Sequence, residues 1–261
     1  MKLRLAVLAI LLAVPGLLFA GTSCATPTVA PADSRIVDFD FVGISADNFY
    51  QFDATAGHSY SIEVRQDYDD LQPTNDLATS VFSVADTGCA TPLAVNGTVL
   101  RDTSLIEPAL PANSFRASMT AANTGTYRLR VRNSNPAVGR YVSVKISETT
   151  MYSASFSTNQ PFNTFYAFVN TTSSPITGTL TLTPLGGGGP VPITITIPAN
   201  ALASTNTSVP VFATVVNKVG FATFSHNGPP GAVLISAAIA NFTTNPAYNQ
   251  VIEFRSVREH Q

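Results

Sequence analysis

The sequence predicts an all-β protein built from two tandem antiparallel β-sandwiches. Outside the first 20 residues, almost every apolar run is short, rich in β-branched residues and bounded by Gly, Pro, Asn or Asp. This pattern is typical of many short strands separated by turns. No later stretch longer than a turn or two repeats its apolar residues at helical spacing, which excludes a helical domain.

The alternation is cleanest in residues 124–146. In its first half the apolar and basic residues have opposite parity, Tyr127, Leu129 and Val131 against Arg128, Arg130 and Arg132. In its second half Val142, Val144 and Ile146 alternate with Ser143 and Lys145. Because strand side chains alternate between faces, we interpret the segment as a hairpin of two strands, with one apolar and one basic side.

The chain begins with the layout of a secretory signal peptide. Two basic residues precede an apolar run from Leu5 to Ala20, which contains Pro15 and Gly16 and is followed by small residues. The run has 16 residues, whereas a membrane-spanning helix needs about 20. We therefore expect a signal peptide within residues 1–25, cleaved between 20 and 25, and no transmembrane segment in the mature chain.

The cleavage position decides the fate of Cys24. Cleavage after Ala20 leaves Cys24 near the mature N-terminus, where it can pair with Cys89, the only other cysteine. Cleavage after Ala25 removes Cys24 and leaves Cys89 as a free thiol. Lipidation of Cys24 is a third alternative, although the preceding residues lack the aliphatic side chain usual three positions earlier. Two cysteines in an exported chain usually form a disulfide, so we expect a Cys24–Cys89 bond.

The composition narrows the class of protein further. Only 11% of the residues are charged and the net charge is −2. The chain is too apolar to be disordered and too neutral to bind nucleic acid. We expect a protein that is secreted or lies at the cell surface or in the periplasm.

The candidate strands fall into two series that meet near residues 147–155. The first series is 36–42, 47–53, 59–65, 78–84, 114–120, 126–132 and 140–146. The second is 155–159, 163–170, 176–183, 191–197, 208–216, 219–225, 232–240 and 249–257. Each series has the length of an ordinary domain. We predict one sandwich over 26–148 and a second over 149–261, packed closely or joined by a short hinge because no flexible linker separates them.

Two motifs of the first half resemble those of bacterial pre-peptidase C-terminal domains. The first motif matches at Asp47, Phe49, Tyr50, Phe52, Thr55, Ala56, Gly57 and Tyr60. The second matches at Gly125, Thr126, Tyr127, Gly139 and Tyr141. The resemblance covers about residues 35–148. It implies a jelly-roll-like, non-catalytic sandwich of the kind that accompanies exported bacterial peptidases and other enzymes.

The second half is similar to immunoglobulin-like modules of bacterial surface proteins. The similarity rests on Asn170 at the end of a strand and on the turn at residues 226–231, His-Asn-Gly-Pro-Pro-Gly. It implies that an immunoglobulin-like sandwich follows the jelly-roll-like one.

The histidines argue against a hydrolase. A catalytic triad needs a nucleophile, a base within hydrogen-bond reach and an orienting acid. His58 and His226 lie in turns and His260 lies next to the last residue, where exposed polar residues are expected. The sequence also lacks a Gly-x-Ser-x-Gly motif. We therefore expect no enzymatic activity.

Calcium is the only cofactor that the sequence indicates. Asp67, Asp69, Asp70 and Asp76 lie in a segment between two candidate strands, and calcium takes oxygen ligands from loops. The spacing is not that of an EF-hand, and acidic loops are commonly just solvated. We expect no cofactor, with calcium at these four residues as the alternative.

Arg128, Arg130 and Arg132 form the best candidate binding site. Alternate residues on a strand lie roughly 7 Å apart, and Lys145 extends the same face if the two strands pair. Such an array can hold an anionic polysaccharide, teichoic acid or lipopolysaccharide through charge-assisted hydrogen bonds. The alternative is a solvated sheet face that deters edge pairing.

These observations together predict a non-catalytic secreted or cell-surface protein with a binding or structural role. Its expected partner is a cell-envelope glycan or an exported protein. The alternative is an accessory module or subunit of a separate exported peptidase or other hydrolase.

Overall fold

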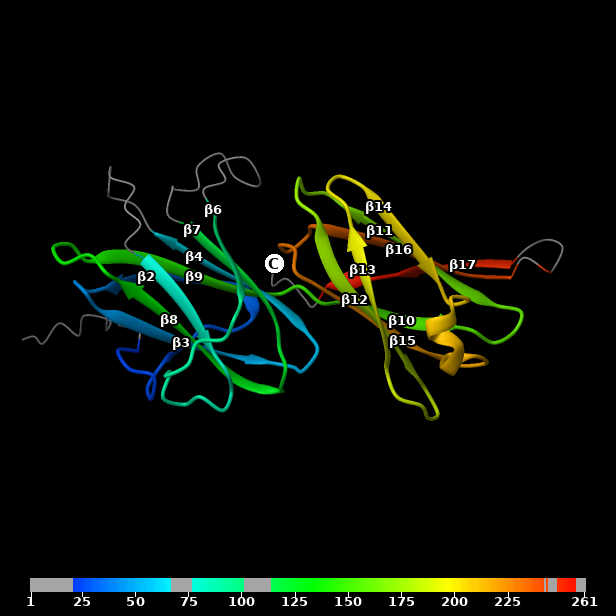
Figure 1. Ribbon diagram of the computed structural model, residues 1–261, viewed down its shortest axis with the longest axis horizontal. Helices are drawn as coiled ribbons and strands as arrows, with labels where there is room; N and C mark the ends of the chain where they lie inside the picture. Colours follow the sequence, from blue (N-terminus) through cyan, green and yellow to red (C-terminus); the bar gives the residue numbers. More distant parts are fainter. Residues whose placement is uncertain (1–20, 67–76, 101–113, 242, 244–247, 257–261) are drawn as a thin grey trace, which may run out of the picture.

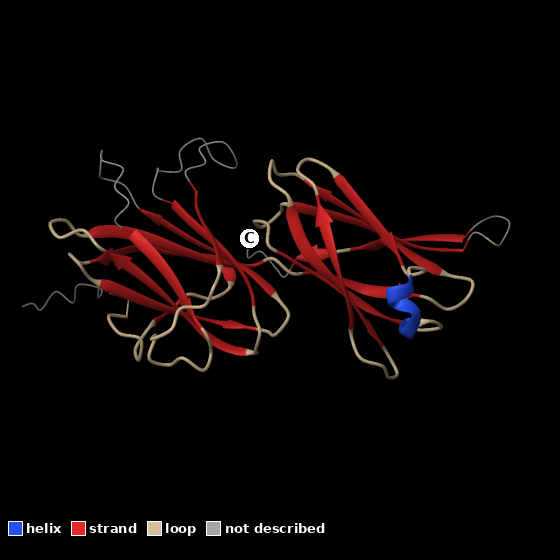
Figure 2. Ribbon diagram, viewed as in Figure 1, coloured by secondary structure: helices blue, strands red, loops and turns tan. Residues whose placement is uncertain are grey.

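The described residues of the computed structural model form two β-sandwiches that lie side by side along the long axis (Figure 1). These residues are 21–66, 77–100, 114–241, 243 and 248–256. Strands make up nearly all of their regular structure, and the single described helix is a short 3₁₀ helix (Figure 2). The prediction of an all-β protein made of antiparallel sandwiches is confirmed.

The first sandwich contains two sheets. The first sheet has the order β1 (Thr28–Val29), β3 (Asp47–Ala54), β8 (Gly125–Asn133) and β5 (Leu77–Phe82). The second has the order β2 (Asp33–Val42), β9 (Arg140–Glu148), β4 (Ser59–Gln66), β7 (Ser114–Thr120) and β6 (Asn96–Leu100). Alternate residues of facing strands, such as Leu129 of β8 and Val144 of β9, are fully buried between the sheets.

The predicted hairpin at 124–146 is wrong, because its two strands lie in different sheets. β8 pairs with β3 and β5, whereas β9 pairs with β2 and β4. A paired hairpin usually has a loop of about two to five residues; the connection at 134–139 instead crosses the sandwich. Buried Asn133 fixes this crossing by donating to the carbonyls of Gly43 at 3.0 Å and Val138 at 2.9 Å.

The second sandwich is also made of two sheets. One has the order β13 (Val191–Ile197), β12 (Ile176–Pro184), β15 (Val219–His226), β10 (Met151–Ser157) and β18 (Arg255–Ser256). The other has the order β14 (Leu202–Asn206), β11 (Asn163–Asn170), β16 (Val233–Asn241) and β17 (Tyr248–Glu253). Phe168 of one sheet meets Phe224 of the other with ring centroids 4.6 Å apart in the core.

Residues 208–216, which the sequence predicts as a strand, instead contain the 3₁₀ helix η1 (Pro210–Val215). The strand in this region, β14, ends before it at Asn206, whose side-chain oxygen accepts from the Ser208 amide at 2.9 Å and turns the chain. Phe212 and Val215 are both buried. Their spacing of three matches the 3₁₀ repeat rather than the alternation of a strand.

The segment that follows residue 20 belongs to the first sandwich. The carbonyl of Gly21 accepts from the Phe49 amide at 2.7 Å, and β1 extends the first sheet by pairing in parallel with β3. Cys24 and Cys89 form a disulfide, which confirms the predicted pairing. Together with Phe49 and Phe82 they form a small cluster on the outer face of that sheet.

Thr149 and Thr150 connect the sandwiches, and both are buried. The Thr149 amide donates to the Ser59 carbonyl at 2.8 Å, and its hydroxyl donates to the His226 carbonyl at 3.1 Å. The Thr150 hydroxyl accepts from the Ser59 amide at 2.8 Å and lies 3.1 Å from the Ser225 hydroxyl. The connection is thus bonded to β4 of the first sandwich and β15 of the second.

Two further hydrogen bonds join β15 directly to the start of β4. The Ser225 hydroxyl donates to the Gly57 carbonyl at 2.8 Å, and the His226 amide donates to the Ser59 hydroxyl at 2.9 Å. A buried polar group that loses its partner destabilises a protein by about 1–3 kcal/mol. Rotating one sandwich against the other would break several of these bonds together, so the junction holds the two sandwiches in one orientation.

We expect the double variant Cys24→Ser, Cys89→Ser to lower the free energy of unfolding of the first sandwich by about 3 kcal/mol. The disulfide spans a sequence separation of 65 residues, and its loss frees the unfolded chain from that constraint. Equilibrium denaturation measures the difference. Wild-type protein kept in reductant is the control and should match the variant. Equal midpoints for the oxidised wild type and the variant would contradict this role.

Candidate functional site

The three arginines of the predicted binding site do share the outer face of the first sheet, but each has an intramolecular contact. Arg128 donates through Nε to the Cys24 carbonyl at 3.2 Å. The Arg130 guanidinium lies 5.3 Å from the centre of the Phe82 ring and donates to the Ser80 hydroxyl at 3.4 Å. Arg128 therefore holds the segment that carries Cys24 against the sheet, whereas Arg130 packs on the neighbouring strand β5; both arginines are half-buried.

Arg132 forms the most regular of these contacts. Its Nε and one terminal nitrogen donate to the two oxygens of Asp47, at 2.7 and 3.0 Å. This bidentate pair raises the pKa of the Arg132 guanidinium through the hydrogen bond and charge of Asp47. The carboxylate neutralises the most exposed of the three arginines, which weakens any attraction to an anionic ligand.

Lys145 does not extend the arginine face. It lies on β9 in the other sheet, opposite Glu63 of β4. The prediction that it joins the arginines is wrong because it depended on pairing between β8 and β9. Glu63 in turn accepts from Arg116 at 2.9 Å and from Arg65 at 3.3 Å.

The predicted calcium ligands Asp67, Asp69, Asp70 and Asp76 lie outside the described residues. Among the residues that the structure describes, no three His, Cys, Asp or Glu side chains are grouped so that they could hold a metal ion. The calcium site stays a prediction.

The expectation that His226 is exposed is wrong. Its residue is only 4% exposed because it is the last residue of β15 and has the core-facing parity of Ala222 and Phe224. Its Nδ1 accepts from the Gly228 amide at 3.2 Å, and its ring lies 5.8 Å from that of Phe224. Burial lowers the pKa of His226 to about 4, so the ring is neutral at physiological pH.

His58 lies at the rim of the same junction. Its Nδ1 is 2.8 Å from a carboxylate oxygen of Glu148 and 2.9 Å from the Tyr152 hydroxyl, which itself donates to Glu148. Burial, together with the hydrogen bond to Glu148, raises the pKa of Tyr152 above its ordinary value. This phenol stays protonated and is a poor nucleophile. The contact therefore links the sandwiches through His58 and Tyr152, without the activated hydroxyl that a hydrolytic triad requires.

One described depression lies on the second sandwich, on the outer face of the sheet β14-β11-β16-β17. Register places Phe165 between Asn206 and Ala238, and places Ala167 between Ser204 and Ser236. We call these six residues the β11 face. They have the opposite parity to the buried Tyr166 and Phe168 of the same strand.

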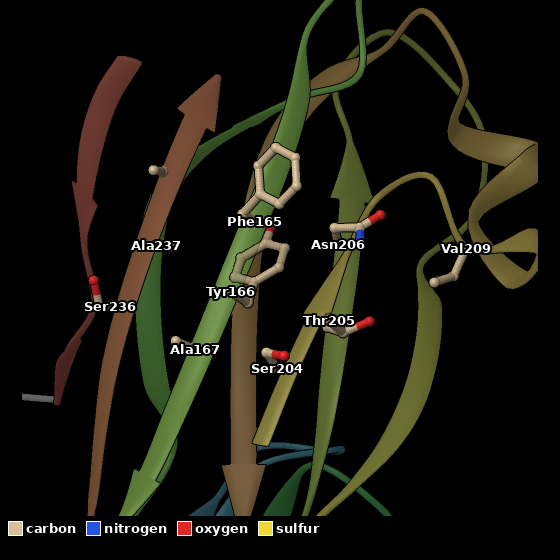
Figure 3. Close-up of a pocket in the computed structure, with 10 residues that line it drawn as sticks. Phe165, Tyr166, Ala167, Ser204, Thr205, Asn206, Val209, Ser236 and Ala237 are labelled. Carbon is tan, nitrogen blue, oxygen red and sulfur yellow. The ribbon is translucent and has the colours of Figure 1, made fainter. Parts of the chain in front are cut away.

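The β11 face lines a depression of about 400 Å³, with Val209 on its wall (Figure 3). Figure 3 shows the Phe165 ring along β11, Ser204 and Asn206 on the neighbouring β14, and Ser236 on the opposite side. This volume falls within the range of roughly 300–1,000 Å³ that is common for small-molecule sites. The small side chains of Ala167, Ser204 and Ser236 form its low floor.

An exposed apolar ridge continues the β11 face along the strands. Val169 lies between Leu202 and Leu234, and the two leucines are 59% and 58% exposed. Contiguous exposed apolar residues commonly mark a binding surface. The sequence does hold a signal for this face: both parities of residues 165–169 are apolar, whereas a half-buried strand should be polar on one side.

A second depression of about 450 Å³ lies beside η1, between Pro161, Phe162 and Pro210. Its wall includes Thr243, whose neighbours 242 and 244–247 lie outside the described residues. We therefore build no site on it.

No family model matches the sequence, and neither does any curated protein. Among solved structures, the full extracellular region of zebrafish Gpr126/Adgrg6 is similar over 90% of this chain and 31% of that chain. The sequence identity is 12% and the TM-score is 0.27, a similarity too low to support an argument about fold or function. The resemblances to pre-peptidase C-terminal domains and to immunoglobulin-like modules stay predictions.

We expect the stability of the protein to fall by up to about 3 kcal/mol between pH 6.5 and pH 4 because of His226. The unfolded chain takes up a proton near the ordinary pKa of 6.5, whereas the buried ring does so only near pH 4. The contribution is therefore fully present above pH 6.5 and is lost as the pH falls towards 4. Denaturation at several pH values measures it. His226→Asn keeps an acceptor for Gly228 but does not titrate, so its decline should be smaller; parallel curves would contradict this assignment.

We expect Arg130→Ala to lower the free energy of unfolding by about 1 kcal/mol, because it removes a cation–π contact and buried side-chain packing. The matched control is Arg132→Ser, which changes an exposed ion pair on the same strand and should cost less than about 0.5 kcal/mol. Denaturation midpoints compare the two variants. A larger loss of unfolding free energy in Arg132→Ser than in Arg130→Ala would contradict the structural role of Arg130.

Proposed function

We propose that the chain is an exported, non-catalytic binding protein whose ligand lies on the β11 face. The observation that carries this proposal is the depression around Phe165, continued by the exposed ridge of Val169, Leu202 and Leu234. An apolar surface of this kind with a few polar groups is the usual chemistry of a binding site. The rigid junction supports the proposal, because it presents this face in a fixed direction relative to the first sandwich.

Export is supported by the N-terminal sequence and by the disulfide. Residues 1–20 have the composition of a signal peptide, and disulfides form mainly in oxidising compartments. Gly21 and Cys24 contact the first sandwich, which favours cleavage after Ala20 over cleavage after Ala25. In the described part of the chain, no helix is both long and apolar enough to cross a bilayer.

The alternative surface for an envelope ligand is the arginine face. Contacts of Arg128 and Arg130 with Cys24, Ser80 and Phe82 leave Arg132 as its most exposed cation, and Asp47 pairs with it. This arrangement favours a structural role for the arginines and the β11 face as the ligand-binding surface. The alternative function is that of an accessory module or subunit of a separate exported peptidase or other hydrolase. That hydrolase would then copurify with this chain.

We expect the purified mature protein to cosediment with an insoluble envelope preparation from its own cells, and Ala167→Phe to lose this binding by at least tenfold. The new ring fills the floor of the depression from an outward-facing position, so the core should be unaffected. Arg132→Ser is the matched control and should bind as the wild type does. Loss of binding in Arg132→Ser with full binding in Ala167→Phe would assign the ligand to the arginine face instead.

A further inference from the structure

We propose that two copies of the chain join through β17, whose strands pair antiparallel around a twofold axis at Val251. The inference goes beyond the proposed function, because it does not depend on what the β11 face binds. β17 lies at one end of the sheet β14-β11-β16-β17 and, in the described part of the chain, pairs only with β16. Its other side therefore presents main-chain N–H and C=O groups to which another strand can bind.

β17 lacks the features that usually keep an edge strand from pairing with another chain. Such edges are commonly protected by Pro, Lys, a bulge or short length. The register of β17 with β16 is unbroken over its six residues, which include neither Pro nor Lys. Other edges of the described sheets do carry these features: β13 contains Pro192, β2 has two register shifts, and β1 and β18 have two residues each. β17 is therefore an edge suited to pairing.

Val251 indicates where the twofold axis lies. It is 73% exposed, the highest fraction among the described large apolar residues that are exposed. Its partner in register is the small Ala238 of the β11 face, so it lies on the outer face of the sheet, whereas Ile252 is buried. Antiparallel pairing centred on Val251 places the same residue of the second copy directly opposite. Two β-branched side chains in these positions pack together and stabilise the pair of strands.

The polar residues of β17 also fit a second copy. Asn249 and Glu253 lie two residues away from Val251 on either side and share its face. The axis at Val251 places Asn249 of each copy opposite Glu253 of the other, where the amide can donate to the carboxylate. Both bonds from Arg255 go to Oε2 of Glu253, so Oε1 can accept. Parallel pairing would instead place the two Glu253 side chains opposite each other, and like charges in that position are destabilising.

A twofold axis closes the assembly at two copies, because each copy uses its β17 edge once. The axis is perpendicular to the sheet, so the two four-stranded sheets become one continuous sheet with both β11 faces on the same side. An extended peptide of another protein can add to a free edge in the same way. The self-complementary placement of Val251, Asn249 and Glu253 favours a second copy, since a peptide has no need of it.

Sedimentation velocity of the purified mature protein between about 1 μM and about 1 mM tests the pairing, because an edge interface is small and requires high concentration. We expect an equilibrium between monomer and dimer. Val251→Lys should weaken the dimer by about tenfold or more, because two ammonium groups then meet at the axis. Leu234→Lys is the matched control: Leu234 is 58% exposed on the same face, but on the inner strand β16, and should leave the dimer unchanged.

Cysteine cross-linking tests the register separately. Cys24 and Cys89 are the only cysteines and are bonded to each other, so one substitution supplies the only thiol. Opposite Cα atoms of antiparallel strands lie about 4.5–5.5 Å apart, within the span of a disulfide, so oxidised Val251→Cys should run as a covalent dimer on a non-reducing gel. Asn249→Cys is the control and should stay monomeric, because the two copies of residue 249 would lie about 14 Å apart.

Other outcomes overturn the inference in distinguishable ways. If the wild type stays monomeric throughout and Val251→Lys loses envelope cosedimentation, the edge takes a strand of another protein. If Leu234→Lys abolishes the dimer and Val251→Lys retains it, two copies join through the ridge instead. A wild-type monomer with no effect of Val251→Lys on cosedimentation leaves β17 without a partner. Ala167→Phe should dimerise as the wild type does, so failure of the proposed function and failure of this inference are separate results.

Discussion

The hydrogen bonds around Thr149 and Thr150 are the interaction on which the shape of the molecule depends. Only these two residues link β9 to β10, and both are buried against Ser59, Ser225 and His226. The bonds combine backbone and hydroxyl groups from both sandwiches in one buried contact. There the loss of one group leaves its hydrogen-bond partners unpaired away from water. Two domains that share so short a buried connection behave as one body, and a surface on one has a defined direction relative to the other.

A second constraint shapes the first sandwich. The Cys24–Cys89 disulfide and Arg128 of β8 hold the segment after residue 20 on the outer face of the sheet. That face is therefore a small second core, with Phe49 and Phe82 as its apolar part. The alternation of β8, which suggested a basic binding surface, thus belongs to a face that the segment after residue 20 covers. The open depression lies on the second sandwich.

Alternation along the chain was enough to predict most of the strands, because period-two patterning depends only on local geometry. It missed β14 and predicted a strand over 208–216, where η1 forms instead. It could not predict which strands pair. β8 and β9 are neighbours in sequence, yet Asn133 directs the chain across to the other sheet, so Lys145 could not be placed correctly. His226 was misjudged because β15 extends through it: it has the same parity as the buried Ala222 and Phe224, and its ring packs near that of Phe224. The β11 face was missed because its residues come from three strands, β14, β11 and β16, that the sequence does not bring together.

The most direct test of the fixed junction is the measurement of residual dipolar couplings for backbone amides in both sandwiches of the intact mature protein. If the buried hydrogen bonds hold one orientation, a single alignment tensor fits the couplings of β3, β4, β8 and β9 together with those of β11, β12, β15 and β16. Two tensors of clearly different magnitude would mean that the sandwiches move independently, and would contradict the account.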